Sequence, residues 1–544
     1  MNVIVLKFSL QYTIPLVMNL VKGLSIKNMY YIGSKSGHPD LADLKAANCN
    51  FTPFTEPDLF NALFADVDWQ EIEPLDKDIL LKMAPYESEI LRLFERDFQV
   101  VNKDDHASFE QDYYETKISL RAQNFSTYIN QVEMSGEEKR RRYYRYLRFW
   151  NDFLNKNKID LTITTYYPHF PYEYILYRLC QARGIRTIIM SHTPLPGKWL
   201  IYEDIDKSCE DLANLPRISD DIEVLQQSFS RNTKDEIHRI LTGEKPYYMV
   251  KGYVENLLKN DKIEPQIQEN NRIRRLRPAK GDPKKKWSIF NAFDRMLIMD
   301  KIHFKFRHKS KGELTRRLMA YYESKATKTP DLGKNYIYLA LHYQPEASNS
   351  PVGGYYANQL LIADLISYYL PEGWLLYVKD HPAQSIINRN VDFYYDLSKN
   401  KRVVIMSKSV DTFELSKNAK AVATIAGTAA MECLLFGKPV FLFGASPLMY
   451  CNGTFNIRTK KDIITAIEAV KNGFLPNKID VYNYIKRLDD RTVDAVHDHS
   501  HMAQFGVTGE QYTERMTAYY LDYIRNGASH TELDSVSHTQ QPQS

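Results

Sequence analysis

Short apolar runs alternate with helix-like stretches in the second half of the chain. The runs occupy residues 336–341, 374–378, 403–405, 421–424 and 440–443. Buried parallel strands read as continuous apolar runs of this length, and the helices between them provide the crossover connections. The pattern therefore predicts a parallel sheet. The polar or small residues after each run should gather at its carboxyl edge, where α/β proteins bind ligands.

The first half of the chain repeats the pattern in two βαβ units. Apolar runs at 3–6 and 29–32 flank one helix-like stretch, and runs at 161–165 and 187–190 flank another. The apolar stretch 12–21 has a second interpretation, as a signal peptide. Polar residues interrupt it and no small-residue cleavage site follows, so a βαβ opening is favoured.

Length and composition favour a soluble enzyme of more than one domain. At 544 residues the chain is too long for one hydrophobic core, which indicates two α/β domains with additions. The composition is 44% hydrophobic and 25% charged, and the net charge of +4 does not indicate a nucleic-acid partner. The five cysteines lack CxxC spacing, so we expect reduced core thiols of a cytosolic protein.

Changes in the pattern divide the chain into segments with predicted boundaries. These are an N-terminal α/β domain at 1–243, a basic helical linker or insertion at 244–333, a C-terminal α/β domain at 334–480, C-terminal helices at 481–527 and a disordered tail at 528–544. The tail is rich in Ser, Thr, Gln and His, a composition that buries too little apolar surface to fold.

A basic run followed by aromatic and apolar residues marks the middle of the chain. The cations are Arg272, Arg274, Arg275, Arg277, Lys280, Lys284, Lys285 and Lys286, and Trp287, Phe290 and Phe293 follow them. Such a segment can anchor a protein to an anionic membrane surface through 272–298. It can equally be a solvated linker before an ordinary amphipathic helix. Both interpretations stay open.

The loop Lys379-Asp380-His381-Pro382 is the leading candidate for chemistry. It follows the apolar run 374–378, which places a titratable imidazole at the carboxyl end of a buried strand. Pro382 restricts the loop, and Lys379 adds a charge that attracts phosphate. The alternative is a loop histidine whose hydrogen bonds are satisfied by the backbone.

A second candidate is the strand-loop-helix unit at 427–439. Gly427 lets the backbone approach a ligand, while the Thr428 hydroxyl and the first helix amides, from Ala429 onward, can bind a phosphate. Glu432 could accept hydrogen bonds from ribose hydroxyls. The alternative is an ordinary helix start with an exposed Glu in its first turn, favoured by the helix dipole.

Two further polar segments have weaker signals. Gln344 and Glu346 follow the first strand of the second half, and the loop 348–355 after them could line the site, act as a lid or be a plain surface loop. Residues 497–501 have metal-like side chains. A solvated loop is favoured there, because ligands so close in sequence rarely all face one ion, and no metal site is assigned.

These motifs together resemble a known family. LHYQPEAS at 341–348, KDHP at 379–382, DTFEL at 411–415 and GTAAMECLLFGKPVFLFG at 427–444 resemble bacterial capsule polysaccharide biosynthesis proteins, which are GT-B-type glycosyltransferases. Residues 164–188 also look like the N-terminal half of such proteins. The His-Pro motif is similar to that of sialyltransferases, Kdo transferases and CDP-glycerol glycerophosphotransferases, where the histidine acts near the donor phosphate.

The resemblance implies a GT-B-like α/β fold, with two Rossmann-type parallel-sheet domains facing a central cleft. It implies a nucleotide-sugar donor, for example a CMP-sugar, in the C-terminal half, and a glycan or lipid-linked acceptor in the N-terminal half. The implied donor-binding residues are Lys379, Pro382, Gln344, Glu346, Gly427, Thr428, Ala429 and Glu432. Gly-Thr-Ala stands where several relatives carry Ser-Ser or Ser-Thr, which leaves the nucleotide open.

The resemblance also implies metal-independent catalysis, without a cofactor, at the cytoplasmic face of the membrane. His381 would act on the donor side, and the base would come from the N-terminal half, with His169, Glu203 and Asp204 as unranked candidates. Three other functions stay open at this point: a CDP-polyol phosphotransferase, a nucleotide-sugar epimerase of related fold, and a non-catalytic glycan-binding scaffold.

Overall fold

The computed structural model describes most of two α/β units. The described residues are 1–6, 13–33, 41–55, 69–97, 136–168, 170–244, 316–344, 348–382, 384, 389–495, 505 and 507–527. His169, Glu346, the basic segment 272–298, residues 497–501 and the predicted tail lie outside them.

The N-terminal unit contains a seven-stranded sheet in the order β13-β6-β5-β4-β1-β2-β3. Its parallel strands are β1 (Asn2–Leu6), β2 (Asn28–Gly33), β3 (Asn50–Thr55), β4 (Leu161–Thr164) and β5 (Arg186–His192). Two strands extend one edge: β6 (Lys198–Tyr202) pairs antiparallel to β5, and β13 (Val493–Asp494) pairs antiparallel to β6.

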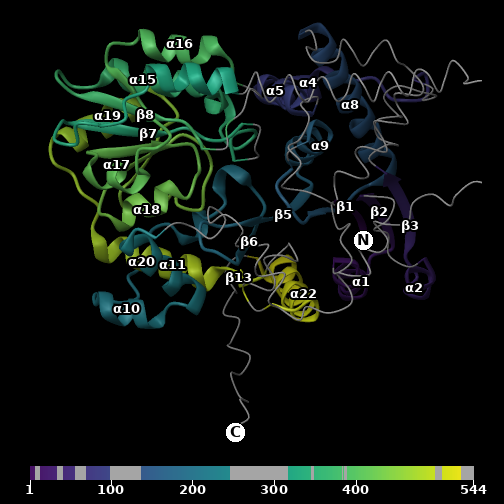
Figure 1. The fold of residues 1–544 in the computed structure, drawn as a ribbon. Coiled ribbons are helices and arrows are strands. Elements are labelled where there is room, and N and C mark those ends of the chain that lie inside the picture. The colour runs from purple at the N-terminus through teal and green to yellow at the C-terminus, as the bar shows by residue number, and fades with distance from the viewer. Residues whose placement is uncertain are drawn as a thin grey trace, which may run out of the picture.

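Helices cover both faces of this sheet, as the alternation of side chains along β1 requires. Val3 and Val5 pack with α1 (Thr13–Leu24) and α22 (Gly509–Asn526), whereas Ile4 and Leu6 belong to the core formed with α5 (Glu87–Asp97), α8 (Gly136–Asn157) and α9 (Pro171–Ala182). Two shorter helices, α2 (Leu41–Ala46) and α4 (Lys77–Met83), complete this unit together with the turn η1 (Ala84–Tyr86) (Figure 1).

The second unit contains a six-stranded sheet in the order β12-β11-β10-β7-β8-β9, and all its pairings are parallel. The strands are β7 (Tyr336–Ala340), β8 (Leu375–Lys379), β9 (Val403–Met406), β10 (Ala421–Thr424), β11 (Val440–Leu442) and β12 (Thr454–Asn456). The strand order reverses between β7 and β10, which makes this the topological switch point of a doubly wound sheet.

Two helical layers cover the second sheet. One layer contains α15 (Gln359–Tyr369), α16 (Val391–Lys399) and α19 (Lys460–Lys471), and the other contains α17 (Thr412–Asn418), α18 (Ala429–Leu435) and α20 (Lys478–Arg491). Local sequence fixes where several helices start, because side chains there accept hydrogen bonds from backbone N–H groups that would otherwise have no partner. Asn390 caps α16, Asp411 caps α17, and Thr459 forms a capping box with Asp462 at α19.

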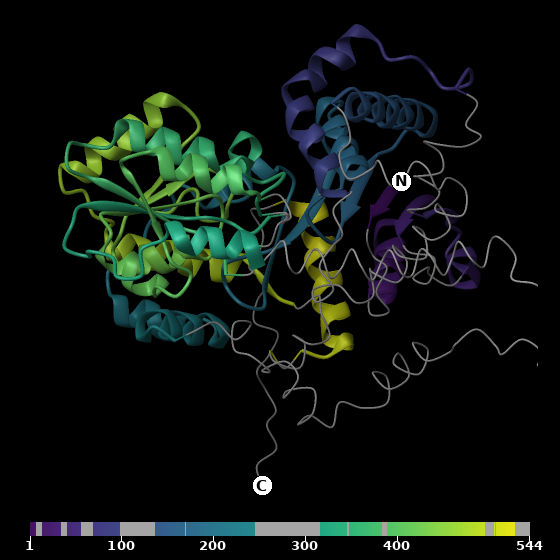
Figure 2. The same cartoon turned by 45° about the horizontal axis from the view of Figure 1, so that its top comes forward.

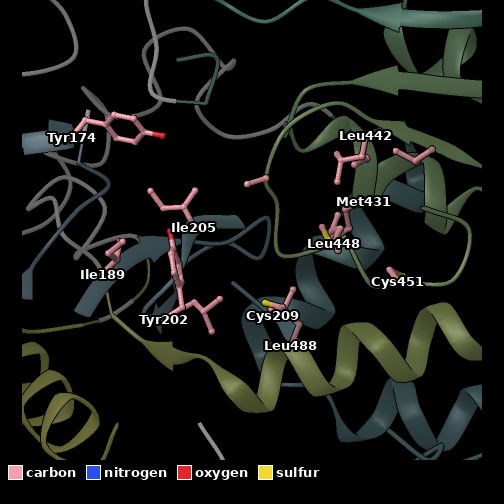
Figure 3. Packing of buried hydrophobic residues seen from close by; sticks show 14 of the residues in the cluster. Tyr174, Ile189, Tyr202, Ile205, Cys209, Met431, Leu442, Leu448, Cys451 and Leu488 are labelled. Atoms are coloured by element: carbon pink, nitrogen blue, oxygen red, sulfur yellow. The ribbon is translucent and has the colours of Figure 1, made fainter. Parts of the chain in front are cut away.

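The chain crosses between the units more than once. Helices α10 (Ile222–Ser228) and α11 (Arg231–Thr242) pack against α20 and α18 of the second unit. After α20, the chain returns through β13 and α22 to the N-terminal unit, a path that Figures 1 and 2 both show. One hydrophobic core therefore spans both units. Figure 3 shows part of it: Tyr202 and Ile205 lie on one side, Met431 and Leu448 lie on the other, and Cys209 and Leu488 lie next to each other between them.

The predicted fold class is confirmed, since two Rossmann-type parallel sheets are present. The strands β6 and β13 were not predicted, and β13 lies within the segment 481–527, for which only helices were predicted. All five cysteines are buried and free of disulfides. In the described part of the chain, no helix combines the length and apolarity that crossing a membrane requires.

Candidate functional site

The switch point is formed by the residues that follow β7 and β10. His342 comes directly after β7, and its Nε2 lies 2.8 Å from Thr424 Oγ1 and accepts the Ala426 amide at 3.4 Å. Burial lowers the pKa of His342 to about 3, so the imidazole is neutral. A Cβ atom at Gly427 would lie only 3.1 Å from this ring, so a larger residue would crowd it. Glycine at this position lets the backbone pack closely against His342.

The buried carboxylate of Asp380 fixes the loop that contains His381 and Pro382. Asp380 Oδ1 accepts the His381 amide at 2.8 Å, and Oδ2 accepts the Tyr394 hydroxyl. Arg389 Nε lies 3.9 Å from the same Oδ2. His381 is half-buried, and its ring centroid is 5.5 Å from that of Tyr343. This network fixes the backbone from which the imidazole projects.

Burial also determines the charge of His381. It lowers the pKa of the imidazole, Asp380 opposes the shift, and Lys408 and Lys379 add to it. The ring is therefore neutral at pH 7 in the free protein. A neutral imidazole can still donate one hydrogen bond to a phosphate oxygen.

The cation beside His381 is Lys408, and not the predicted Lys379. Lys379 is buried, and its ammonium donates to Val410 O at 2.6 Å, in the loop after β9, and to Thr412 Oγ1 at 2.9 Å, at the start of α17. Lys408 donates to the carbonyl of Pro382 at 3.2 Å. The sequence contained the signal, because Lys408 follows a predicted strand just as His381 does.

Gln344 was predicted to contact the donor, but in the structure its hydrogen bonds go to residues of the loops that follow β7 and β8. Its amide Nε2 donates to Ala357 O at 2.7 Å, its backbone exchanges hydrogen bonds with Gln384 at 2.8 and 3.1 Å, and its Oε1 accepts from Arg389. Pro382 is exposed. Arg389 is a buried cation that sequence reasoning missed, since it lies far along the chain from any predicted strand end.

The start of α18 carries one exposed and one buried candidate. Thr428 is exposed, and its side chain makes no capping hydrogen bond. Ala429 is half-buried behind it. Glu432 is buried, and its Oε1 lies 3.8 Å from Arg239 Nη2 of α11. Burial raises the pKa of Glu432 to about 7 against the effect of Arg239. The Glu432 carboxyl faces α11, so this position does not support the predicted contact with a ribose. Its burial also does not support the alternative, an exposed Glu in the first helical turn.

The loop after residue 348 is packed into the carboxyl edge of the second sheet. A Cβ at Gly353 would lie 2.6 Å from Asn349 O, and one at Gly444 would lie 2.8 Å from Val352 O. The loop leads into the turn η6 (Gly354–Ala357), where Arg92 of α5 donates to Tyr355 O at 2.7 Å and Gly354 O at 3.3 Å. The loop therefore joins the two units.

The predicted base candidates have structural partners where the structure describes them. Glu203 Oε1 lies 2.7 Å from Arg186 Nη2, and this arginine also donates to backbone carbonyls of α22. Asp204 caps the turn η3 (Ile205–Lys207) by accepting the Asp206 amide at 2.9 Å. Both carboxylates thus have contacts within the N-terminal unit, their role as base stays a prediction, and His169 lies outside the described residues.

A family comparison covers the part of the chain that contains these residues. Residues 354–452 match the family of capsule polysaccharide biosynthesis proteins. The resemblance is confirmed for this segment. It runs from η6 to the segment just before β12 and includes His381, Thr428 and Glu432. None of the curated protein sequences matches the chain significantly.

Several solved structures share part of the architecture at low identity. The UDP-GlcNAc 2-epimerase of Methanocaldococcus jannaschii is 13% identical over 90% of this chain and 99% of its own, with a TM-score of 0.23. The beta Kdo 2,7 transferase KpsC of Thermosulfurimonas dismutans is 11% identical over 64% and 86%, with a TM-score of 0.24. The spinosyn rhamnosyltransferase SpnG is 10% identical over 90% and 96%, with a TM-score of 0.22. At these values the likenesses carry no argument about activity.

Proposed function

We propose that this chain is a glycosyltransferase of capsule or surface polysaccharide biosynthesis. It transfers a sugar from a nucleotide-activated donor to a glycan or lipid-linked acceptor. The observation that carries the proposal is the position of His381. It projects from the carboxyl end of β8, next to the switch point of a doubly wound sheet, inside the segment that matches the capsule family.

The donor is assigned to the second unit. The hydroxyl of Thr428 and the N–H of His381 are the groups offered to the donor phosphate, with the ammonium of Lys408 nearby. As the bond from the anomeric carbon to the phosphate oxygen breaks, negative charge grows on the phosphate. Prearranged donors and cations stabilise that charge without reorganising. The acceptor then approaches from the N-terminal unit.

Nucleotide binding and one substitution test the proposal. At one hundred times its dissociation constant, the correct member of a panel of CMP, CDP, UDP and GDP should stabilise the protein by about 2.7 kcal/mol. His381→Ala should lower transfer by roughly 10² to 10⁴ with unchanged melting, because the side chain is half-buried at a rim and not in a core. The control is His238→Ala, an exposed histidine on α11.

Two results would count against this function. One is the absence of stabilisation by every nucleotide of the panel. The other is transfer by His381→Ala within a few fold of the wild type, as the scaffold alternative requires. An epimerase is distinguished by its product, because it converts the nucleotide sugar without releasing free nucleotide.

We also propose peripheral attachment to the cytoplasmic face of the membrane through 272–298. The support is the sequence alone, since this segment lies outside the described residues. Each basic residue close to an anionic leaflet contributes roughly 1 kcal/mol, and the attraction falls as salt rises. Flotation with anionic liposomes at low salt is the test. Changing Arg274, Arg275, Lys284, Lys285 and Lys286 to Gln should abolish flotation, and equal flotation of both proteins excludes the proposal.

A further inference from the structure

His381 is fixed at both of its backbone polar groups. Its amide donates to Asp380 Oδ1 at 2.8 Å, and its carbonyl accepts the backbone amide of Gln384 at 3.0 Å. Asp380 and Gln384 are buried, with exposed fractions of 1% and 2%. Because both partners lie in the interior, the backbone of His381 has little freedom to shift, although its imidazole is half-buried at the rim.

Further buried groups connect these two partners to each other. Gln384 Oε1 accepts the backbone amide of Gln344 at 2.8 Å, and Gln384 Nε2 donates to Gln344 O at 3.1 Å. The side-chain oxygen of Gln344 accepts a hydrogen bond from Arg389 Nη1. Arg389 Nε in turn lies 3.9 Å from Asp380 Oδ2. The contacts form a closed cycle that runs from His381 through Asp380, Arg389, Gln344 and Gln384 back to His381.

Arg389 is the member of this cycle that joins the ends of two strands. After β7 its guanidinium contacts the side chain of Gln344 and, through Nη2 at 3.4 Å, the carbonyl of His342. After β8 it pairs with Asp380. Arg389 is 4% exposed, and its central guanidinium carbon lies 4.0 Å from the ring centroid of Phe393. Burying a cation is costly unless it is paired and hydrogen-bonded, so this guanidinium stabilises the arrangement of the two loops that supplies its partners.

We propose that Arg389 is a positioning residue for the sugar transfer, an inference that rests on the proposed glycosyltransferase function. Arg389 is buried and acts through His381. By closing the cycle, it fixes the backbone from which the imidazole reaches the donor phosphate. Hydrogen-bond donors that are already in place stabilise the growing charge without reorganising, and a displacement of an ångström can cost about 10²-fold in rate.

Two variants open the cycle at different places. Arg389→Lys keeps the charge but loses the planar fork that reaches both loops. Gln384→Ala removes a different connection and no charge. The matched control is Arg402→Lys, because Arg402 also lies in the second unit and donates to Ser367 O at 3.2 Å and Leu370 O at 2.6 Å, outside the cycle. Thermal unfolding of each variant checks that the fold is kept.

The assay is nucleotide release from CMP-, CDP-, UDP- and GDP-sugars with an added hydroxyl compound as acceptor, and calorimetry measures the affinity for the free nucleotide. We expect Arg389→Lys and Gln384→Ala to slow release roughly ten- to hundredfold, with nucleotide affinity close to that of the wild type. In a His381→Ala background the same substitutions should cause no further loss, because residues that act through one group are not additive. Arg402→Lys should keep the wild-type rate.

A nuclear magnetic resonance spectrum of isotope-labelled histidine rings follows His381 directly and needs no donor. The signal of His381 is the one that disappears in His381→Ala. Arg389→Lys and Gln384→Ala should shift this signal, and Arg402→Lys should leave it in place.

Two results overturn the positioning role and leave the proposed function standing. One is an Arg389→Lys variant whose His381 signal is unchanged. The other is a loss of the same size in the wild-type and His381→Ala backgrounds, which would mean that Arg389 does not act through His381. Failure of the wild type to release nucleotide from any of the donors overturns both the positioning role and the proposed function.

Discussion

Glu432 is a buried carboxyl whose charge opposes folding. Its pKa is about 7 in the folded protein, against an ordinary value of 4.5. The folded state therefore binds this proton more tightly than the unfolded state does. The contribution to stability is fully present below pH 4.5 and is lost as the pH rises through 7.

Glu432→Gln should remove this pH dependence. A glutamine keeps the shape and stays neutral, so the free energy of unfolding of the variant should rise relative to the wild type between pH 5 and pH 8. The expected gain is at most about 3 kcal/mol, since each pKa unit corresponds to roughly 1.4 kcal/mol. Urea unfolding of both proteins at the two pH values measures it. A difference that stays constant with pH would contradict the ionisation of Glu432.

Single residues also show how far the sequence could predict the site. The strand ends, His381 and Gly427 were identified because apolar runs stop there. The direction of Lys379 was misjudged, although strand alternation contains the answer. Lys379 lies on the same face of β8 as Tyr377, which packs in the core shared with α17. Arg389 and Lys408 were missed because their contacts join segments that are separated in sequence.

Among the elements, α22 packs on parts of the chain that lie hundreds of residues away in sequence. Tyr519 in this helix is buried, and its hydroxyl donates to Arg491 O at 2.7 Å. The same oxygen accepts from Arg491 Nη1 at 2.7 Å and from the Ile201 amide of β6 at 3.3 Å. One phenol therefore connects the end of α20, the edge of the first sheet and the last described helix.

Tyr519→Phe should destabilise the protein by about 1 to 3 kcal/mol, because it leaves buried donors and an acceptor without their partner. Thermal or urea unfolding measures the loss. Tyr368→Phe is the control, since that side chain is 78% exposed. Equal stability of the two variants would mean that the contacts of α22 contribute little. The prediction of helices at 481–527 includes α22 but not the sheet that it covers, because that choice depends on contacts between residues hundreds of positions apart.

At the scale of the whole molecule, Arg92 links the two units directly. Its guanidinium donates to two carbonyls of η6. Arg92→Ala should therefore weaken the contact between the N-terminal unit and the second unit without creating a cavity in a hydrophobic core. We expect transfer to fall by about tenfold or more, since misplacement by an ångström can cost about 10²-fold, while nucleotide affinity stays unchanged. Kinetics and calorimetry distinguish these effects.

The control for this prediction is Arg140→Ala, which removes an ion pair within the N-terminal unit between a largely exposed arginine and Glu87. Exposed pairs of this kind contribute little. If both variants transferred sugar at the wild-type rate, the contact at η6 would not help to align the units.

The repeated crossing of the chain has a consequence for its assembly. A cut between residues 244 and 316 would separate α10 and α11 from α18 and α20, on which they pack, and β13 and α22 from the sheet they complete. Each fragment would then expose apolar surface that only the other can cover. Neither half should be soluble when produced alone, whereas the two halves produced together should reassemble by fragment complementation.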